Sequence, residues 1–100
     1  MATKIVRECG FEQITGLSSA KGLTLVSNAD GSVPNAVILS VEAQNVRYRC
    51  DGTNPTSSIG NRIIKDQQPF LYDGDLKAIK FIEESASAKI NAQYVLVEYY

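Results

Sequence analysis

Apolar and polar residues alternate along much of this chain, in short runs that are separated by turn-forming residues. In VRYRC (46–50), Val46, Tyr48 and Cys50 alternate with two arginines. This spacing of two is typical of a strand with one buried face. Weaker runs of the same kind are FEQIT (11–15), GLTLVS (22–27), NAVILSVEAQ (35–44), NRIIK (61–65), QPFLY (68–72) and AKINAQYVLVEYY (88–100).

The spacing of these runs predicts an all-β fold. Residues that form turns cheaply stand between them, as in NADGS (28–32) and DGD (73–75). Seven or eight short strands at about ten-residue spacing are typical of an antiparallel β-sandwich or a jelly-roll-like barrel. We therefore expect one of these two architectures.

One segment, LKAIKFIEESASAK (76–89), fits two structures equally well. Leu76, Ile79, Ile82 and Ala86 recur three to four residues apart, as on one face of a helix. Within the same segment, AIKFIE also alternates as a strand would. The pattern alone leaves both structures open.

The size of the chain predicts a single domain, residues 1–100, that buries roughly two thirds of its unfolded surface. Residues 1–10 are a candidate N-terminal arm, and residues 95–100 a candidate interface strand. The net charge of −1 gives no reason to expect nucleic-acid binding, which needs a clear basic excess. No apolar run reaches the roughly 18 residues of a membrane helix. The N-terminus has no signal-peptide core, so we expect synthesis in the cytoplasm without export.

No group of residues in the sequence predicts catalysis, a cofactor or a metal. The chain contains no histidine, which removes the commonest general base and zinc ligand. Cys9 and Cys50 are far apart in the chain, and we expect two reduced thiols. Ser18 and Lys21 match S-x-x-K but lack the partner motifs of acyl transfer. Asp73 and Asp75 fall far short of a calcium loop.

Two stretches are candidates for an interface. Arg47 and Arg49 share one face of a strand, which leads into the polar loop DGTNPTSSIG (51–60). The alternative is a solvated edge strand with a passive loop. The terminal VLVEYY has two largely apolar faces, so we expect it to be covered on both sides and to pair with another subunit. The candidate interface residues are Arg47, Arg49, Asp51, Thr53, Asn54, Arg62, Val95, Val97, Tyr99 and Tyr100.

Three motifs together resemble a group of small virion proteins of tailed bacteriophages and prophages. They are CGFEQIT (9–15), EAQNVRYRCDGTNPT (42–56) and GDLKAIKFIEESASAKIN (74–91), and the resemblance extends from Cys9 to Tyr94. It implies a compact β-sandwich on the capsid or at the head–tail region. It also implies that LKAIKFIE is a strand, joined to the last strand by ESASA as a hairpin turn.

The resemblance and the missing catalytic motifs together predict a non-enzymatic virion protein, one that decorates or cements the capsid shell. The expected partners are the major capsid protein or other virion proteins, with self-association, for example as a trimer. A head–tail connector or tail component is the first alternative. A carbohydrate- or ligand-binding β-module on the virion surface is the second, and Tyr48, Phe70 and Tyr72 are its candidate aromatic residues.

Overall fold

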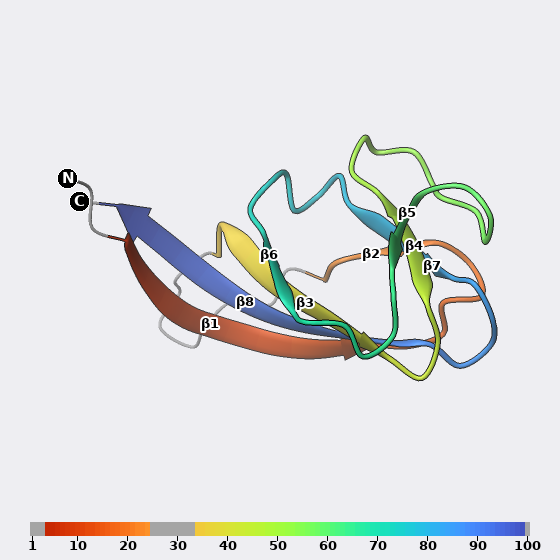
Figure 1. Ribbon diagram of the computed structural model, residues 1–100. Helices are drawn as coiled ribbons and strands as arrows, with labels where there is room; N and C mark the ends of the chain where they lie inside the picture. Colours follow the sequence, from red (N-terminus) through yellow and green to blue (C-terminus); the bar gives the residue numbers. More distant parts are fainter. Residues whose placement is uncertain (1–3, 25–33, 100) are drawn as a thin grey trace.

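The computed structural model describes residues 4–24 and 34–99, and within them the chain forms eight strands in two four-stranded antiparallel sheets (Figure 1). The strands are β1 (Lys4–Ile14), β2 (Lys21–Gly22), β3 (Ala36–Glu42), β4 (Val46–Arg49), β5 (Asn61–Ile63), β6 (Phe70–Tyr72), β7 (Lys80–Glu83) and β8 (Lys89–Tyr99). The expected β-sandwich is confirmed, and the sheets do not close into a barrel. The turn expected at 28–32 and the end of the strand expected at 22–27 lie outside the described residues.

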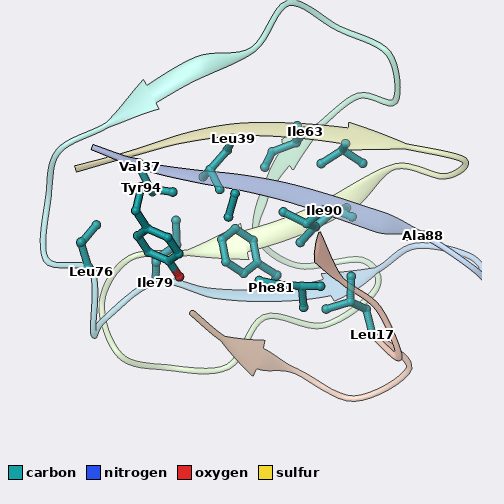
Figure 2. Close-up of a cluster of buried hydrophobic side chains, with 14 residues drawn as sticks. Leu17, Val37, Leu39, Ile63, Leu76, Ile79, Phe81, Ala88, Ile90 and Tyr94 are labelled. Carbon is teal, nitrogen blue, oxygen red and sulfur yellow. The ribbon is translucent and has the colours of Figure 1, made fainter. Parts of the chain in front are cut away.

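The first sheet has the order β1-β8-β3-β6 and the second the order β2-β7-β4-β5. Their facing sides bury one apolar cluster, because alternate residues of each strand point the same way (Figure 2). The largest fully buried side chains of this cluster are Tyr94, Phe81, Leu17, Leu39, Ile63, Ile79, Ile90, Val37, Val41 and Val46.

β1 and β8 form a long ribbon that extends beyond the second sheet (Figure 1). Near the second sheet, β8 buries Ile90, Ala92 and Tyr94 against it. Past Tyr94 the buried face changes, because Val95 and Val97 belong to a separate apolar cluster on the other side of the ribbon. Their companions there are Ala36, Ile38 and Leu71.

The change of buried face coincides with a β-bulge in β1. Glu8 pairs with Val95 and Gly10 pairs with Tyr94, so Cys9 is the extra residue. A bulge bends its strand and increases the local twist, so it can re-aim the ribbon between its two halves. Residues 4–10, the described part of the expected N-terminal arm, belong to β1 and are not separate from the sheet.

The segment that fitted both helix and strand contains β7. Residues 76–78 form a turn, Lys80–Glu83 form the strand, and 84–88 form a loop. The helix is excluded, but the expected hairpin is also wrong, since β7 and β8 lie in different sheets. ESASA therefore carries the chain from one sheet to the other.

As far as Val97, β8 is paired inside the subunit along both of its edges. β1 pairs with it from Ile90 to Tyr99, and β3 pairs with it as far as Val95. Beyond β3, the Asn35 side chain takes over: its Oδ1 accepts from Val97 N at 2.8 Å and its Nδ2 donates to Val97 O at 2.9 Å. The expected pairing of residues 95–97 with another subunit is thus replaced by pairing within the chain.

Candidate interaction surface

The outer face of the second sheet carries four cations. β4 alternates, so its two arginines face outward while its two apolar residues face the core. The strand register places Arg62 opposite Arg47 and Lys80 opposite Arg49. Residues directly opposite on neighbouring strands share a face. We define these four residues, Arg47, Arg49, Arg62 and Lys80, as the basic face.

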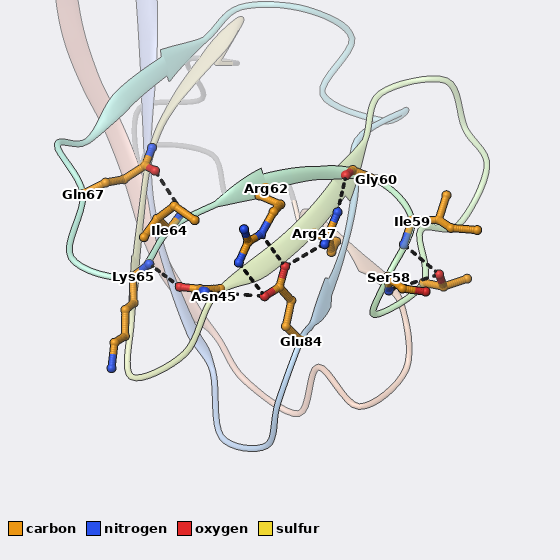
Figure 3. A network of polar contacts seen from close by, with 11 residues as sticks. Asn45, Arg47, Ser58, Ile59, Gly60, Arg62, Ile64, Lys65, Gln67 and Glu84 are labelled. Carbon is orange, nitrogen blue, oxygen red and sulfur yellow. Dashed lines mark hydrogen bonds and ion pairs between the residues drawn. The ribbon is translucent and has the colours of Figure 1, made fainter.

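Glu84 holds two of these arginines at the end of β7 (Figure 3). Its Oε2 accepts from Arg47 Nε at 2.6 Å and from Arg62 Nε at 2.8 Å, and its Oε1 accepts from Arg62 Nη2 at 3.1 Å. The hydrogen bond from Arg62 is the largest reason that the pKa of Glu84 lies below its usual range, and the bond from Arg47 adds to it. One carboxylate therefore fixes two guanidinium groups in a defined arrangement.

The other two cations of the basic face are Arg49, which is bound by a carboxylate, and Lys80, which lies over a glycine. Arg49 donates to Asp51 through two nitrogens, at 2.5 Å and 3.2 Å, and this contact lowers the pKa of Asp51. The Lys80 amine lies over Gly22, where an added Cβ would stand 3.0 Å from Nζ. A larger residue than glycine at position 22 would displace this lysine.

The basic face keeps an excess of positive charge. Glu84 and Asp51 are the carboxylates that bind its arginines, so two of the four positive charges are not balanced by these ion pairs. The whole chain has a net charge of −1, so its charges are unevenly distributed. Ile82 lies between the cations, in register with Arg47. A cationic surface with a small apolar centre suits an acidic protein surface.

The loop of residues 51–60 lies beside the basic face and is shaped by its own hydrogen bonds. Thr56 Oγ1 accepts from Ile59 N at 3.0 Å, and Thr56 N donates to Ile59 O at 2.9 Å. Pro55 is a buried residue of the loop, and Arg47 Nη1 donates to Gly60 O at 3.1 Å. The Ile59 side chain is 58% exposed. The loop is thus an anchored surface that displays an apolar side chain.

Gly60 requires its glycine. Its φ is 138°, and an added Cβ would lie 3.0 Å from Tyr48 O. Only glycine adopts this conformation cheaply, so the loop returns to β5 by passing close to the backbone of β4.

The predicted interface residues fall in two separate places. Arg47, Arg49, Asp51 and Arg62 come together on the second sheet, and Thr53 and Asn54 are exposed in the adjacent loop. Val95 and Val97 lie in the first sheet and are buried within the subunit, which corrects their expected role as interface side chains. Tyr99 is paired in β8 through its backbone, and Tyr100 lies outside the described residues.

Sequence reasoning missed Glu84 and Lys80. Glu83 and Glu84 are adjacent in the sequence, and adjacent residues do not face one another, so they do not indicate a site as a pair. Their relation to the arginines depends on β7 lying beside β4, and these strands are far apart in the chain. The opposite charges of Glu84 and the arginines were the feature of the sequence that could have indicated this contact, since opposite charges on neighbouring strands attract each other.

The candidate aromatic residues for a carbohydrate site pack against the core. The Tyr48 ring lies 6.3 Å from the Phe70 ring and 6.5 Å from the Phe81 ring. Desolvation is the main reason that the pKa of Tyr72 rises to about 12, with Cys50 contributing, and its hydroxyl donates to Asp75 O at 2.9 Å. Tyr48, Phe70 and Tyr72 are partly buried and pack against the core. Their rings do not form an exposed surface on which a sugar could stack.

An open depression of about 360 Å³ lies at one end of the sandwich. Its lining residues are Thr15, Gly16, Ser18, Glu83, Ser87, Ala88 and Lys89. Most of them are exposed, and the depression contains none of the predicted interface residues. It is separate from the basic face.

Residues 4–24 and 34–99 contain neither a group of candidate metal ligands nor a helix that could span a membrane. No three histidine, cysteine, aspartate or glutamate side chains gather there as metal ligands. These residues also form no helix of the length and apolar character needed to cross a membrane. Comparison of the chain with protein families, curated proteins and solved structures gave no match.

Proposed function

We propose that this chain is a non-enzymatic structural protein of a bacteriophage virion, made in the bacterial cytoplasm, that decorates or cements the capsid shell. The observation that carries the proposal is the basic face beside an anchored, partly apolar loop. The resemblance of residues 9–94 to small virion proteins supports the setting. The partner is the major capsid protein or another virion protein.

Attachment uses the charges that the basic face leaves unbalanced. Arg62 has a side chain that is 47% exposed even while it binds Glu84, so it can reach a second carboxylate. Complementary charges speed association and fix orientation more than they add affinity. Ile59 and Ile82 add apolar contacts at the loop and between the cations. Each contact is modest, but a subunit held at several points gains effective concentration for every further contact.

An acidic protein surface suits the basic face better than a nucleic acid does. Single-stranded nucleic acid is bound by cations interleaved with exposed aromatic rings. On this sheet, Tyr48 and Phe81 point to the core side, opposite to the arginines. The net charge of −1 also gives no long-range attraction for a polyanion.

The location of the protein in purified particles tests the proposal. Quantitative mass spectrometry of isolated heads and isolated tails should detect this chain on heads, at a fixed ratio to the major capsid protein. Recovery from tails or connectors, and not from heads, would favour the head–tail or tail role. Absence from both would overturn the virion proposal.

A further inference from the structure

Two arginines of the basic face are each held by a carboxylate along one edge of the guanidinium group. Arg62 donates from Nε and Nη2 to the two oxygens of Glu84, and Arg49 donates from the same two nitrogens to Asp51. A guanidinium group has more N–H donors than one carboxylate can bind. Nη1 of both arginines makes no hydrogen bond to a residue that the structure describes, so this end of each group is open to a further acceptor.

The two carboxylates are themselves fixed by neighbouring residues. Asn45 Nδ2 donates to Glu84 Oε1 at 3.4 Å, and Asn45 O accepts from Glu84 N at 3.0 Å. Asp51 Oδ1 accepts from Thr53 N at 3.1 Å. Both arginines are therefore ordered before a partner arrives. A side chain that is already ordered loses less conformational entropy on binding than a free one.

The strand register sets the spacing of the two arginines. Arg62 lies opposite Arg47, and Arg49 is two residues further along the strand of Arg47, so Arg62 and Arg49 are diagonal neighbours. Diagonal neighbours in an antiparallel pair are about 7–8 Å apart. Alternate residues of an extended chain are roughly 6.5 Å apart on one face, and residues one turn apart on a helix are about 5–6 Å apart. The spacing of the arginines thus suits an extended segment better than a helix.

We propose that the basic face binds an extended acidic segment of its protein partner, with carboxylates on alternate residues, and that Glu84 and Asp51 are positioning residues for this contact. One carboxylate of the segment binds the Nη1 side of Arg62, and the next binds the Nη1 side of Arg49. The inference rests on the proposed function, because it takes the partner of the basic face to be a protein.

The other two cations have supporting roles. Arg47 is less accessible than Arg62, since its side chain is 22% exposed against 47%, and its Nη1 already donates to Gly60 O. Lys80 stands opposite Arg49 and has no ion pair with the part of the chain that the structure describes. It therefore adds an unbalanced positive charge beside the second carboxylate.

Two peptide isomers of equal charge test the spacing with the full chain. One contains Asp-Thr-Asp and the other Asp-Asp-Thr, each between the same glycine and serine flanks and with a fluorescein label. Fluorescence anisotropy at low salt should show at least about threefold tighter binding of the first isomer, because alternate residues share a face of an extended chain and adjacent residues do not. Equal binding of the isomers, or binding of neither, would overturn the proposal.

Neutralising the positioning carboxylates tests their role. Glu84→Gln and Asp51→Asn each remove one negative charge, so attraction between net charges alone predicts tighter binding of the Asp-Thr-Asp peptide. Positioning predicts the opposite, a loss of about threefold or more in each variant. Glu42→Gln is the matched control, because Glu42 is exposed on the outer side of the first sheet, bonded to Gln13 and Asn91. This control should bind the peptide like the wild type.

Melting curves establish that each variant is folded. Asp51→Asn keeps the test decisive if Glu84→Gln does not fold, since the Asp51 side chain is largely exposed at the start of the loop. Arg62→Lys keeps the charge but replaces the planar fork by one ammonium, and it should also bind the peptide more weakly. A folded Glu84→Gln or Asp51→Asn variant that binds the peptide as tightly as the wild type would overturn the proposal.

Failure of this inference and failure of the proposed function give different results. The peptide experiments use no virion component, so their outcome does not depend on where the chain is located. Absence of the chain from heads and tails, together with the expected peptide binding, would overturn only the virion role. Presence on heads without discrimination between the isomers would overturn only the extended acidic segment.

Discussion

The Asn35 side chain forms both hydrogen bonds of a strand partner with Val97, at 2.8 Å to its N–H and 2.9 Å to its C=O. β3 ends its pairing with β8 at Val95, so this amide extends the ladder by one position without a strand. Closing an edge in this way protects it from pairing with other chains.

Asn35→Ala should destabilise the fold and open this edge. Two hydrogen bonds are lost, so we expect a decrease of about 1–2 kcal/mol in the free energy of unfolding. Chemical denaturation measures this change, and light scattering should show new self-association. Asn35→Asp retains the acceptor but not the donor, and its stability should lie between the two. Wild-type stability in Asn35→Ala would show that the amide contributes nothing.

In β8 the buried side chains are at even-numbered positions up to Tyr94 and at odd-numbered positions from Val95. We therefore expect alanine substitutions to destabilise the fold most at even-numbered positions before this change and at odd-numbered positions after it. Ile90 is fully buried and should cost about 2–5 kcal/mol when replaced by alanine. Asn91 faces outward, bonded to Gln13, and its replacement should cost about 1 kcal/mol or less. Both values come from equilibrium denaturation.

Past the bulge, truncating Val95 to alanine should reduce the free energy of unfolding more than truncating the larger Leu96. Val95 is fully buried, and Val95→Ala should cost about 2 kcal/mol, from about 0.8 kcal/mol per methylene-sized group plus a cavity. Leu96 is only half-buried, so Leu96→Ala should cost less, although it removes a larger group. A Leu96→Ala cost above that of Val95→Ala would contradict the change of face.

The ion pairs of Glu84 with Arg47 and Arg62 predict that stability depends on pH. The pKa of Glu84 is lower in the folded chain than in the unfolded chain, chiefly through Arg62. The carboxylate therefore stabilises the fold fully above the unfolded-state pKa of about 4.3, and this stabilisation is lost as the pH falls through the lower folded-state value. The melting temperature of the wild type should exceed that of Glu84→Gln by a constant few degrees from pH 8 to pH 5.

Below about pH 4 the same difference should shrink toward zero. Arg62→Gln removes the largest cause of the lowered Glu84 pKa. In an Arg62→Gln background, the melting-temperature difference between Glu84 and Glu84→Gln should therefore be smaller at every pH above 5. A wild-type advantage that is unchanged at pH 2.5 would show that the Glu84 charge has no part in it.

The loop of residues 51–60 should tolerate loss of its exposed apolar side chain. Ile59→Ser leaves both backbone hydrogen bonds with Thr56 in place, so stability should change by less than about 0.5 kcal/mol. Attachment to particles should nevertheless weaken. By contrast, replacing the whole loop by an Asn-Gly turn also removes the buried Pro55, so some stability should be lost. Full attachment of both folded variants would make the loop a passive connection.

The sequence predicted the strands of the fold better than their partners. Period-two alternation located β3 and β4, because most of each strand buries one face. It also located β8, although the buried face of that strand changes after Tyr94. It did not locate the first half of β1, where apolar and charged residues are mixed. It also could not show that β7 and β8 belong to different sheets, since the alternation of a strand carries no information about its neighbours.

The candidate site was predictable to the same extent. Arg47 and Arg49 follow from the alternation of β4 alone, and their outward direction was anticipated. Lys80 and Glu84 join them only through the β4–β7 pairing, which is a long-range contact. The interface role expected for Val95 and Val97 was wrong because two apolar faces on one strand can both be covered within a single subunit.

Attachment of charge variants to purified heads tests the central claim most directly. Arg62→Gln with Lys80→Gln removes two charges from the basic face, and Lys77→Gln with Lys89→Gln removes two from exposed positions elsewhere. In co-sedimentation with heads that lack this chain, the account predicts at least about tenfold weaker binding for the first variant, greater at low salt, and wild-type binding for the second. Equal binding of the two folded variants would contradict it.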